Sequence, residues 1–367
     1  MYPKEFSLIL GNFNNQFINP LSLTIKNMEK GKVLAFGELL WRLASVSKTF
    51  GPAEHLQVFP GGAEANAVSN LGLWQIPISY LTVVPDNELS AKALGELENA
   101  GVDTSVTIKQ GDRMGLYFLL SANGLTTGQV VYDRKYSAFS QLTPGMIDWE
   151  TILDDYSWFH WSALTPALSE NLAGVCKEAL EVAHRKGLTI SVDLNYRNRL
   201  WDYGKTPLEI MPELVQYCDI IMGNIWASNK MLGTPIDESL DRNTGVERYL
   251  EYAELTSKAI IEKHPQCKHV AFTYRFMDNP GHNLFYGTYY DGSKQYNSAV
   301  YETNELIDRI GSGDAFMAGL IYSLYNGLAG QEVIDFTTSA AFQKLFVHGD
   351  FGKSTLEQVK ENILAVK

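Results

Sequence analysis

The chain has 367 residues, 45% of them hydrophobic and 20% charged, and a formal net charge of −12. This composition excludes a largely disordered chain, and the acidic balance argues against binding nucleic acid or an anionic membrane through the overall charge. No apolar run approaches the roughly 20 residues that cross a bilayer, and the first residues lack a secretory signal. The three cysteines are far apart, which predicts neither disulfides nor a zinc site. We therefore expect a cytoplasmic protein.

The first 27 residues differ from the rest of the chain. They include the Asn-rich stretch "GNFNNQFINP" and show no sustained hydrophobic periodicity. We interpret residues 1–27 as a poorly ordered N-terminal extension, with Met28 as an alternative start. No internal repeat or Pro/Ser-rich linker interrupts the remainder, so residues 28–367 are expected to form one domain.

From residue 33 onward, short apolar runs alternate with helix-length amphipathic stretches. This alternation is typical of parallel βαβ units. Two predicted helices, 89–101 and 169–187, each end on a glycine, as a C-terminal cap requires. The pattern predicts an α/β fold with a doubly wound, mostly parallel sheet and helices on both faces. The predicted strands are 33–36, 78–84, 158–164, 189–195, 219–224 and 269–274.

One region departs from this alternation. Residues 113–135 contain two strand-like runs on either side of Asn123-Gly124, which is a strong hairpin-turn signal. Together with the segment that follows the first strand, this hairpin predicts a small β-sheet lid over the carboxyl edge of the main sheet, where α/β proteins bind ligands. The lid segments are expected around residues 38–60 and 110–140.

The stretch "RIGSGDAF" places three small residues before Asp314 at the start of an apolar helix. One interpretation is that Asp314 only caps the helix. The other is that the backbone N–H groups of this turn bind a phosphate while Asp314 acts as a general base. The second interpretation accounts for Gly311 and Gly313, which allow a ligand to approach the main chain closely. The motif is neither a P-loop nor a dinucleotide fingerprint.

Two motifs resemble those of the ribokinase-like (PfkB) carbohydrate kinases. "DRIGSGDAFMAGL" is similar to the family's C-terminal D-x-x-G-A-G-D motif, with Ser312 in place of the usual Ala, and "PGGAEANAVSNLGL" is similar to its N-terminal Gly-Gly motif. The resemblance implies a ribokinase-like fold and transfer of phosphate from ATP with Mg²⁺, and it admits a monovalent cation. It implies that Asp314 is the catalytic base and that Gly311, Ser312 and Gly313 form the anion hole.

Within this family the chain looks most like the 2-keto-3-deoxygluconate kinases, through "GGAEAN", "VVYDRKYSAFSQLTPG", "HWSALTPALS" and "VDLNYRNRLW". The implied reaction phosphorylates the terminal primary hydroxyl of the sugar acid and gives the 6-phosphate. The resemblance also implies nucleotide-side positions at Asn195, Asn224 and Thr273. The implied acceptor-binding residues are Gly62, Asn66, Tyr117, Tyr132, Arg134, Arg197 and Asp350.

Charge favours the sugar acid, because an acidic protein needs a positioned guanidinium to hold an anionic substrate. Arg134 and Arg197 are the candidates. The alternatives are that Arg197 serves the nucleotide and that Arg134 is a solvated residue at a hairpin end. Lys135, Arg199 and Lys344 are interpreted as surface charges.

Two departures from the family pattern touch the nucleotide side. Ala227 stands where an N-x-x-E motif, linked in the family to Mg²⁺ and phosphate, would have Glu. Residues 273–283, "TYRFMDNPGHN", are expected to form a longer and bulkier loop than the family's tight turn. These departures keep two alternatives open: a kinase for a neutral sugar such as fructose, and a catalytically weak sugar-binding homologue. The apolar run "LYFLL" in the lid favours a homodimer through this sheet.

Overall fold

The computed structural model describes residues 31–45, 55–120, 130–279 and 281–366. The expected N-terminal extension, the alternative start at Met28 and the turn at Asn123-Gly124 lie outside these residues. Within the described ranges the strands form a main sheet of nine, a lid sheet of four and a pair of two.

The main sheet is mostly parallel, as predicted. Its order is β14-β13-β12-β11-β10-β9-β1-β4, with β15 paired to β13. Six neighbouring strands run parallel to one another: β4, β1, β9, β10, β11 and β12. Strands β13, β14 and β15 add an antiparallel edge. All six predicted strands are confirmed, the second one divided between β4 and β5. The strands are β1 (Lys32–Phe36), β4 (Ile78–Leu81), β9 (Tyr156–Ser162), β10 (Thr189–Asp193), β11 (Ile220–Gly223), β12 (His269–Phe276), β13 (Asn283–Tyr290), β14 (Gln295–Asn297) and β15 (Tyr301–Thr303).

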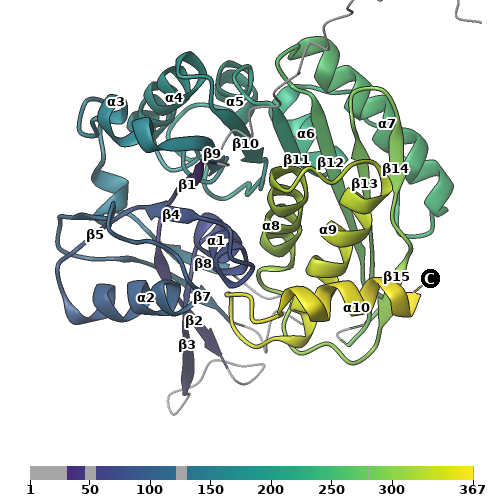
Figure 1. Cartoon of the computed structure of the whole chain (residues 1–367), viewed down its shortest axis with the longest axis horizontal. Helices are drawn as coiled ribbons and strands as arrows, with labels where there is room; N and C mark the ends of the chain where they lie inside the picture. The colour runs from purple at the N-terminus through teal and green to yellow at the C-terminus, as the bar shows by residue number, and fades with distance from the viewer. Residues whose placement is uncertain (1–30, 46–54, 121–129, 280, 367) are drawn as a thin grey trace, which may run out of the picture.

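Helices cover both faces of this sheet and bury two separate apolar clusters. Successive residues of β1 alternate between the clusters, as side chains on opposite faces of a strand must. One face is covered by α3 (Trp149–Ile152), α4 (Glu170–Arg185), α5 (Pro207–Val215), α6 (Ile225–Leu232) and α7 (Val246–Lys263). The other, where α8 and α9 lie side by side in Figure 1, is covered by α1 (Ala63–Leu73), α2 (Glu88–Asn99), α8 (Ser312–Tyr325), α9 (Gln331–Gln343) and α10 (Leu356–Val366).

The helix ends follow the sequence signals. The side chain of Asn87 accepts a hydrogen bond from the backbone N–H of Ser90 at the start of α2, and Ser169 does the same at the start of α4. Gly101 and Gly187 follow these helices with φ of +87° and +75°, a conformation that favours glycine. Short 3₁₀ helices lie at Phe139–Gln141, Leu153–Asp155 and Lys344–Phe346.

The predicted lid is present as a separate sheet in the order β3-β2-β7-β8. It consists of β2 (Leu40–Ser45), β3 (Leu56–Gly61), β7 (Gly115–Leu119) and β8 (Val130–Asp133), and β2 and β3 extend away from the body in Figure 1. Between β3 and β7 in the chain, β5 (Val83–Val84) and β6 (Ile108–Lys109) form a separate two-stranded pair. The association of two chains through the lid stays a prediction.

The prediction of a loop at residues 273–283 is partly wrong. Strand β12 continues through Phe276, and β13 begins again at Asn283 as its antiparallel partner. The strand continues because each backbone group from Val270 to Phe276 meets a partner residue on β13. Only the connection between the two strands is a turn.

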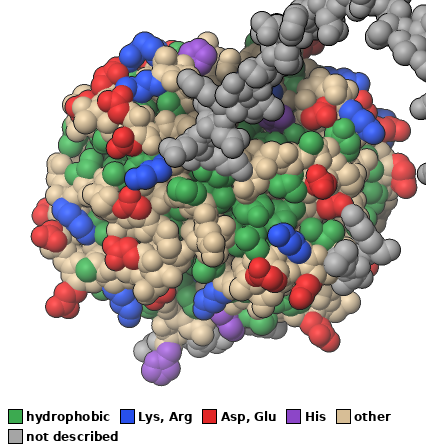
Figure 2. Space-filling model, in the orientation of Figure 1, with side chains coloured by type: hydrophobic (Ala, Val, Ile, Leu, Met, Phe, Trp, Pro, Cys, Tyr) green, Lys and Arg blue, Asp and Glu red, His purple; other side chains and the backbone are tan. Residues whose placement is uncertain are grey.

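The described part of the chain contains no helix that is both long and apolar enough to cross a membrane. In the face visible in Figure 2, side chains of both charge signs are interspersed over the surface. The cytoplasmic location stays a prediction.

Candidate active site

A cavity of about 560 Å³ opens where the lid faces the carboxyl ends of the parallel strands. This is the edge at which parallel α/β sheets bind ligands. The structure brings every predicted site residue to this one cavity, although the residues come from segments far apart in the sequence. They are Gly62, Asn66, Tyr117, Tyr132, Arg134, Asn195, Arg197, Asn224, Thr273, Gly311, Ser312, Gly313, Asp314 and Asp350.

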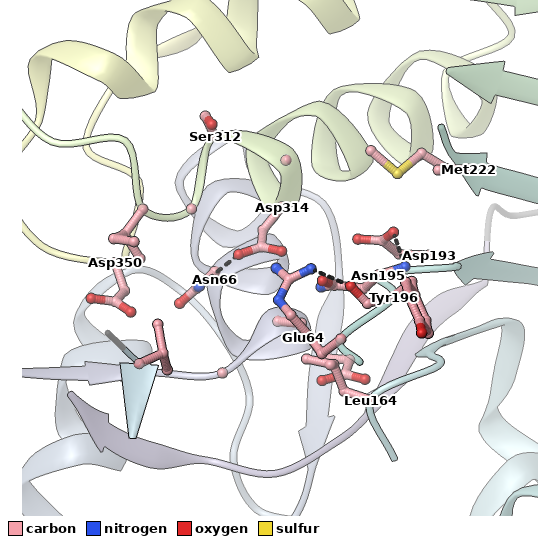
Figure 3. Close-up of a pocket in the computed structure, with 18 of the residues that line it drawn as sticks. Glu64, Asn66, Leu164, Asp193, Asn195, Tyr196, Met222, Ser312, Asp314 and Asp350 are labelled. Carbon is pink, nitrogen blue, oxygen red and sulfur yellow. Dashed lines mark hydrogen bonds between the residues drawn. The ribbon is translucent and has the colours of Figure 1, made fainter. Parts of the chain in front are cut away.

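Asp314 lies in the first turn of α8, and its carboxylate points away from the helix. Its Oδ2 accepts a hydrogen bond of 2.7 Å from Nδ2 of Asn66 on α1 (Figure 3). The N-cap of α8 is Gly311 and not Asp314, and the N-cap position makes no side-chain capping hydrogen bond. The capping interpretation of Asp314 is therefore wrong. The turn leaves the helix N-terminus facing the cavity, with its N–H groups and the positive end of the helix dipole.

The backbone at this turn requires glycine at one position. Gly311 has φ of +82°, and a Cβ on it would lie 2.4 Å from the carbonyl oxygen of Asp350. No L-residue could adopt this conformation without strain. Gly313 has no heavy atom within 4 Å of the place of its missing Cβ, so its role is different: it leaves space beside the N–H groups.

The cavity contains a cluster of carboxyl groups with raised pKa values. Burial, followed by the nearby Asp193 carboxylate, raises the pKa of Asp314 to about 7. Burial also raises the pKa of Glu64 to about 7, and those of Asp193 and Asp350 to about 6. A carboxyl that titrates near neutral pH is suited to general-base catalysis. The prediction missed Glu64 and Asp193, because neither sequence motif distinguishes them from structural residues.

Glu64 is held at the bottom of the site. Its Oε1 accepts a hydrogen bond of 2.9 Å from the backbone N–H of Ser162 at the end of β9. Asp193, at the end of β10, accepts one from the backbone N–H of Asn195, also at 2.9 Å (Figure 3). The carboxyl cluster therefore combines Glu64 of α1, Asp193 at the end of β10 and Asp314 of α8.

The lid contributes Arg134, whose environment differs from the solvated hairpin end considered as an alternative. Its side chain is buried, and its Nε donates a hydrogen bond of 2.6 Å to Oε2 of Glu38. Ser137 donates to the other oxygen of Glu38 at 2.5 Å. The solvated alternative is wrong. Arg134 still lines the cavity, and its Glu38 partner was missed because 96 residues separate the two.

A second buried ion-pair network joins the lid to the turn before α8. Arg42 of β2 lies 2.8 Å from Asp308 and 2.7 Å from Asp350, measured between guanidinium nitrogen and carboxylate oxygen. Tyr117 donates a hydrogen bond of 2.7 Å to the second oxygen of Asp350. The carboxylate of Asp308 in turn accepts from the backbone N–H of Ile310 at 3.0 Å. This network holds the lid strands and the anion-hole turn together.

Lys344 is buried in the same region, so its interpretation as a surface charge is wrong. Its ammonium group donates hydrogen bonds to the carbonyl oxygens of Gly349 at 2.7 Å and Val347 at 3.2 Å. Burial lowers the pKa of this amine to about 8. It is buried because the segment after η4 (Lys344–Phe346) folds back over it, which the sequence pattern does not reveal.

Of the nucleotide-side positions, Asn195 and Asn224 follow the ends of β10 and β11, and Thr273 lies within β12. Asn224 caps α6 by accepting a hydrogen bond of 2.8 Å from the backbone N–H of Ala227. Ala227 is buried in an apolar cluster, and the first turn of α6 contains no acidic residue. Thr273 and Trp226 line the cavity beside Asn224. Among the described residues no cluster of three His, Cys, Asp or Glu side chains is arranged to hold a metal ion.

One further cation faces the anion-hole turn. Arg275 of β12 opens onto the cavity, and its Nη1 lies 3.3 Å from Oγ of Ser312. The prediction treated this residue as part of a loop. The strand pattern of "HVAFTYRF" could have indicated it, since Thr273 and Arg275 share one face of β12.

The doubly wound sheet, the lid and a carboxylate beside a helix N-terminus define a sugar-phosphorylating enzyme of the ribokinase-like class. A family model described as pfkB family carbohydrate kinase matches residues 30–352. The chain belongs to the PfkB family of carbohydrate kinases. It is therefore an enzyme with the ribokinase-like fold that the motifs predicted.

Named relatives support this assignment. The chain is 25% identical to a 2-dehydro-3-deoxygalactonokinase of Haloferax volcanii over 335 residues, which cover 90% of this chain and 95% of the relative. It is 24% identical to a 5-dehydro-2-deoxygluconokinase of Geobacillus thermodenitrificans, over 84% of this chain and 85% of the relative.

Two solved structures are also similar. The structure of 2-dehydro-3-deoxygluconokinase from Thermotoga maritima has a TM-score of 0.83 and 33% identity, and the match covers 91% of this chain and 99% of that one. A putative ribokinase II from E. coli, in complex with ATP and Mg²⁺, shares the fold with a TM-score of 0.71 at 19% identity, over 91% and 99% of the two chains.

Proposed function

We propose that this kinase transfers the γ-phosphate of ATP to the terminal primary hydroxyl of a sugar acid, most specifically 2-keto-3-deoxygluconate, and forms its 6-phosphate. The observation that carries the proposal is the Asp314 carboxylate, which lies at the N-terminus of α8 and is hydrogen-bonded to the acceptor-side Asn66. The names of the relatives, which are kinases of keto-deoxy sugar acids and related acceptors, support the substrate class.

The acceptor side has unused hydrogen-bonding groups for such a substrate. Oδ1 of Asn66 is buried with no partner among the described residues, so it is available to accept from a sugar hydroxyl. Arg197 is exposed to the cavity and has no carboxylate within 4.0 Å in the described part of the chain. Arg134 contacts Glu38 through Nε, and its guanidinium nitrogens lie beside the cavity. These two guanidinium groups suit a carboxylate substrate.

In the proposed reaction, Asp314 accepts the proton of the attacking hydroxyl. The hydroxyl oxygen forms a bond to the γ-phosphorus, the bond from this phosphorus to the β,γ-bridging oxygen breaks, and its electron pair leaves with ADP. The N–H groups at the start of α8 stabilise the charge on the transferring phosphoryl group. The lid excludes water, which would otherwise hydrolyse ATP.

Mg²⁺ fits this cavity as an ion carried by the nucleotide. Mg²⁺ in kinases is bound by one or two carboxylates together with substrate phosphates, and Asp193 and Asp314 are the carboxylates near the phosphate side. The ion would neutralise phosphate charge. Activation by a monovalent cation stays a prediction.

The test is an ADP-release assay with MgATP across 2-keto-3-deoxygluconate, its galacto epimer, gluconate, fructose and ribose. Turnover confined to the keto-deoxy acids supports the proposal. Turnover of fructose or ribose would keep the kinase and refute the acid assignment. Binding of the acids by calorimetry without any turnover would instead support the catalytically weak homologue.

A matched pair of variants tests the carboxylate contact. Arg197→Gln is expected to raise the KM for the acid by about 10- to 100-fold with a smaller effect on kcat, because a charge-assisted contact of about 1.5–3 kcal/mol is lost. Arg199→Gln is the control, since Arg199 donates to the backbone oxygen of Val130 and does not line the cavity. An unchanged KM in Arg197→Gln would remove this residue from the acceptor site.

A further inference from the structure

Arg275 is placed beside the turn that precedes Asp314 by a paired strand. It lies on β12, where it is paired across the sheet with Phe285 of β13. The turn beyond it is clamped by Arg242, whose Nε and Nη2 each donate to the carboxylate of Asp278 at 2.8 Å. Nη2 of Arg309, in the catalytic motif, donates to the backbone oxygen of His282 in the same hairpin at 2.7 Å. The hairpin and the motif are therefore one connected unit.

The contact between Arg275 and Ser312 joins two places where the chain departs from its family. Ser312 replaces the usual Ala, and its hydroxyl donates to the backbone oxygen of Arg309 at 3.0 Å. That leaves the oxygen lone pair free to accept from Nη1 of Arg275 at 3.3 Å. The guanidinium therefore lies beside the turn that precedes Asp314 and lines the same cavity.

Within the described part of the chain, Arg275 has no charge partner of opposite sign. Arg42 and Arg134 each pair with buried carboxylates, but among the described residues no carboxylate lies within 4.0 Å of Arg275. The Arg275 side chain is exposed on the cavity side, and its charged neighbours include Arg309 and Arg197. Arg275 and Arg197 both lack a carboxylate within 4.0 Å among the described residues, and like charges repel, so a polyanionic ligand beside them is favoured.

We propose that Arg275 is a catalytic residue that binds the γ-phosphate of ATP and stabilises the charge on the phosphoryl group during transfer. Arg275 exchanges no proton: it donates hydrogen bonds to the γ-phosphate oxygens while the acceptor oxygen forms its bond to phosphorus and the bond to the β,γ-bridging oxygen breaks. Arg275 thereby supplies positive charge on the nucleotide side of the cavity, where Ala227 stands in place of the family's Glu. The proposal rests on ATP being the donor and is independent of the acceptor.

The test compares the affinity of Arg275→Gln for AMP-PNP and for ADP by calorimetry in the presence of Mg²⁺. Because only AMP-PNP has a γ-phosphoryl group, the variant is expected to bind it about 10-fold or more weakly and to bind ADP within about 3-fold of the wild type. Arg275→Lys, which retains the charge but not the planar fork, is expected to fall between the two. Equal weakening of both nucleotides, or of neither, would overturn the assignment.

Arg242→Gln is the control for the hairpin. It removes the clamp on Asp278 outside the cavity and is expected to leave the ratio of the two affinities unchanged. If Arg242→Gln changes the ratio as much as Arg275→Gln does, the effect is structural and the proposal fails. In an active preparation, Arg275→Gln is also expected to lower kcat by about 10²–10³-fold with the acceptor KM unchanged.

The binding measurement separates this proposal from the proposed function. Wild-type protein that binds AMP-PNP but turns over no acceptor of the panel would refute the sugar-acid assignment and still decide the role of Arg275. Wild-type protein that binds neither nucleotide would overturn both the ATP donor and Arg275.

Discussion

Replacing Asp314 by Asn removes the proposed base and keeps its shape. The amide can still accept the 2.7 Å hydrogen bond from Asn66, so the cavity and its ligand contacts are expected to persist. It cannot accept the proton of the attacking hydroxyl. General-base catalysis contributes about 10²–10⁴-fold, which corresponds to about 3–5 kcal/mol of activation free energy. We expect kcat to fall by this factor and the KM values to change little.

The same substitution has a calculable effect on stability. The pKa of Asp314 is raised from 3.8 to about 7, chiefly by burial and then by Asp193. The unfolded chain therefore loses this proton first, and the stability that the neutral carboxyl allows is lost as the pH rises through about 7. The shift corresponds to about 4 kcal/mol at pH 8, and we expect about half of it, because the side chain is partly open to water in the cavity.

Two measurements test this reasoning. Urea unfolding at pH 5 and pH 8 is expected to show Asp314→Asn more stable than the wild type by about 2 kcal/mol at pH 8 and by less at pH 5. The ADP-release assay measures the loss of kcat on the same protein. Asp112→Asn, at an exposed turn, is the control and is expected to change neither quantity. Near-normal turnover would remove Asp314 as the base, and equal stability changes at both pH values would refute the titration argument.

Two further predictions concern the buried charges behind the anion hole. Lys344→Met is expected to lower kcat by about 10-fold or more. It is also expected to abolish any loss of activity above about pH 8, because the ammonium group that supports the turn loses its proton above that pH. Lys353→Met, at an exposed position, is the control, and a pH profile unchanged in Lys344→Met would contradict this role of Lys344. Arg42→Met is expected to cost about 3–5 kcal/mol in urea unfolding, since it leaves Asp308 without its guanidinium partner, while Arg113→Met at a partly exposed ion pair costs about 1 kcal/mol or less. Equal costs would show that burial of the first pair does not matter.

The sequence was sufficient to predict the main sheet and the location of the site. Parallel strands separated by helices must end at one edge, so motifs after residues 36, 193 and 223 meet there even though they are far apart in the chain. Small residues before Asp314 indicated a phosphate site because glycine permits both a positive φ and a close ligand approach. Short-range rules of this kind account for the predicted strands and the turn before Asp314, whereas the remaining site residues were predicted from the resemblance to the kinase family.

Partners at long range were not predictable. The bonds of Arg42 to Asp308 and of Arg134 to Glu38 span 266 and 96 residues, and no local pattern reports which charges will meet. Lys344 looked like a surface residue because its burial depends on a segment that folds back after it. Arg275 was assigned to a loop because the antiparallel pairing that extends β12 depends on β13, which the parallel pattern did not anticipate.

The charges of the cavity explain how one acidic protein can accommodate two anionic substrates. Carboxyls line the cavity at Glu64, Asp193 and Asp314, and their pKa values of about 6 to 7 reflect the cost of ionising them together in a buried site. Guanidinium groups face the same space from Arg197 and Arg275. The helix N-terminus and these cations would offset the repulsion between a bound phosphate and the carboxylates. In the proposed reaction this places the transferring charge where it is neutralised and also next to Asp314, the proposed base, as in-line transfer requires.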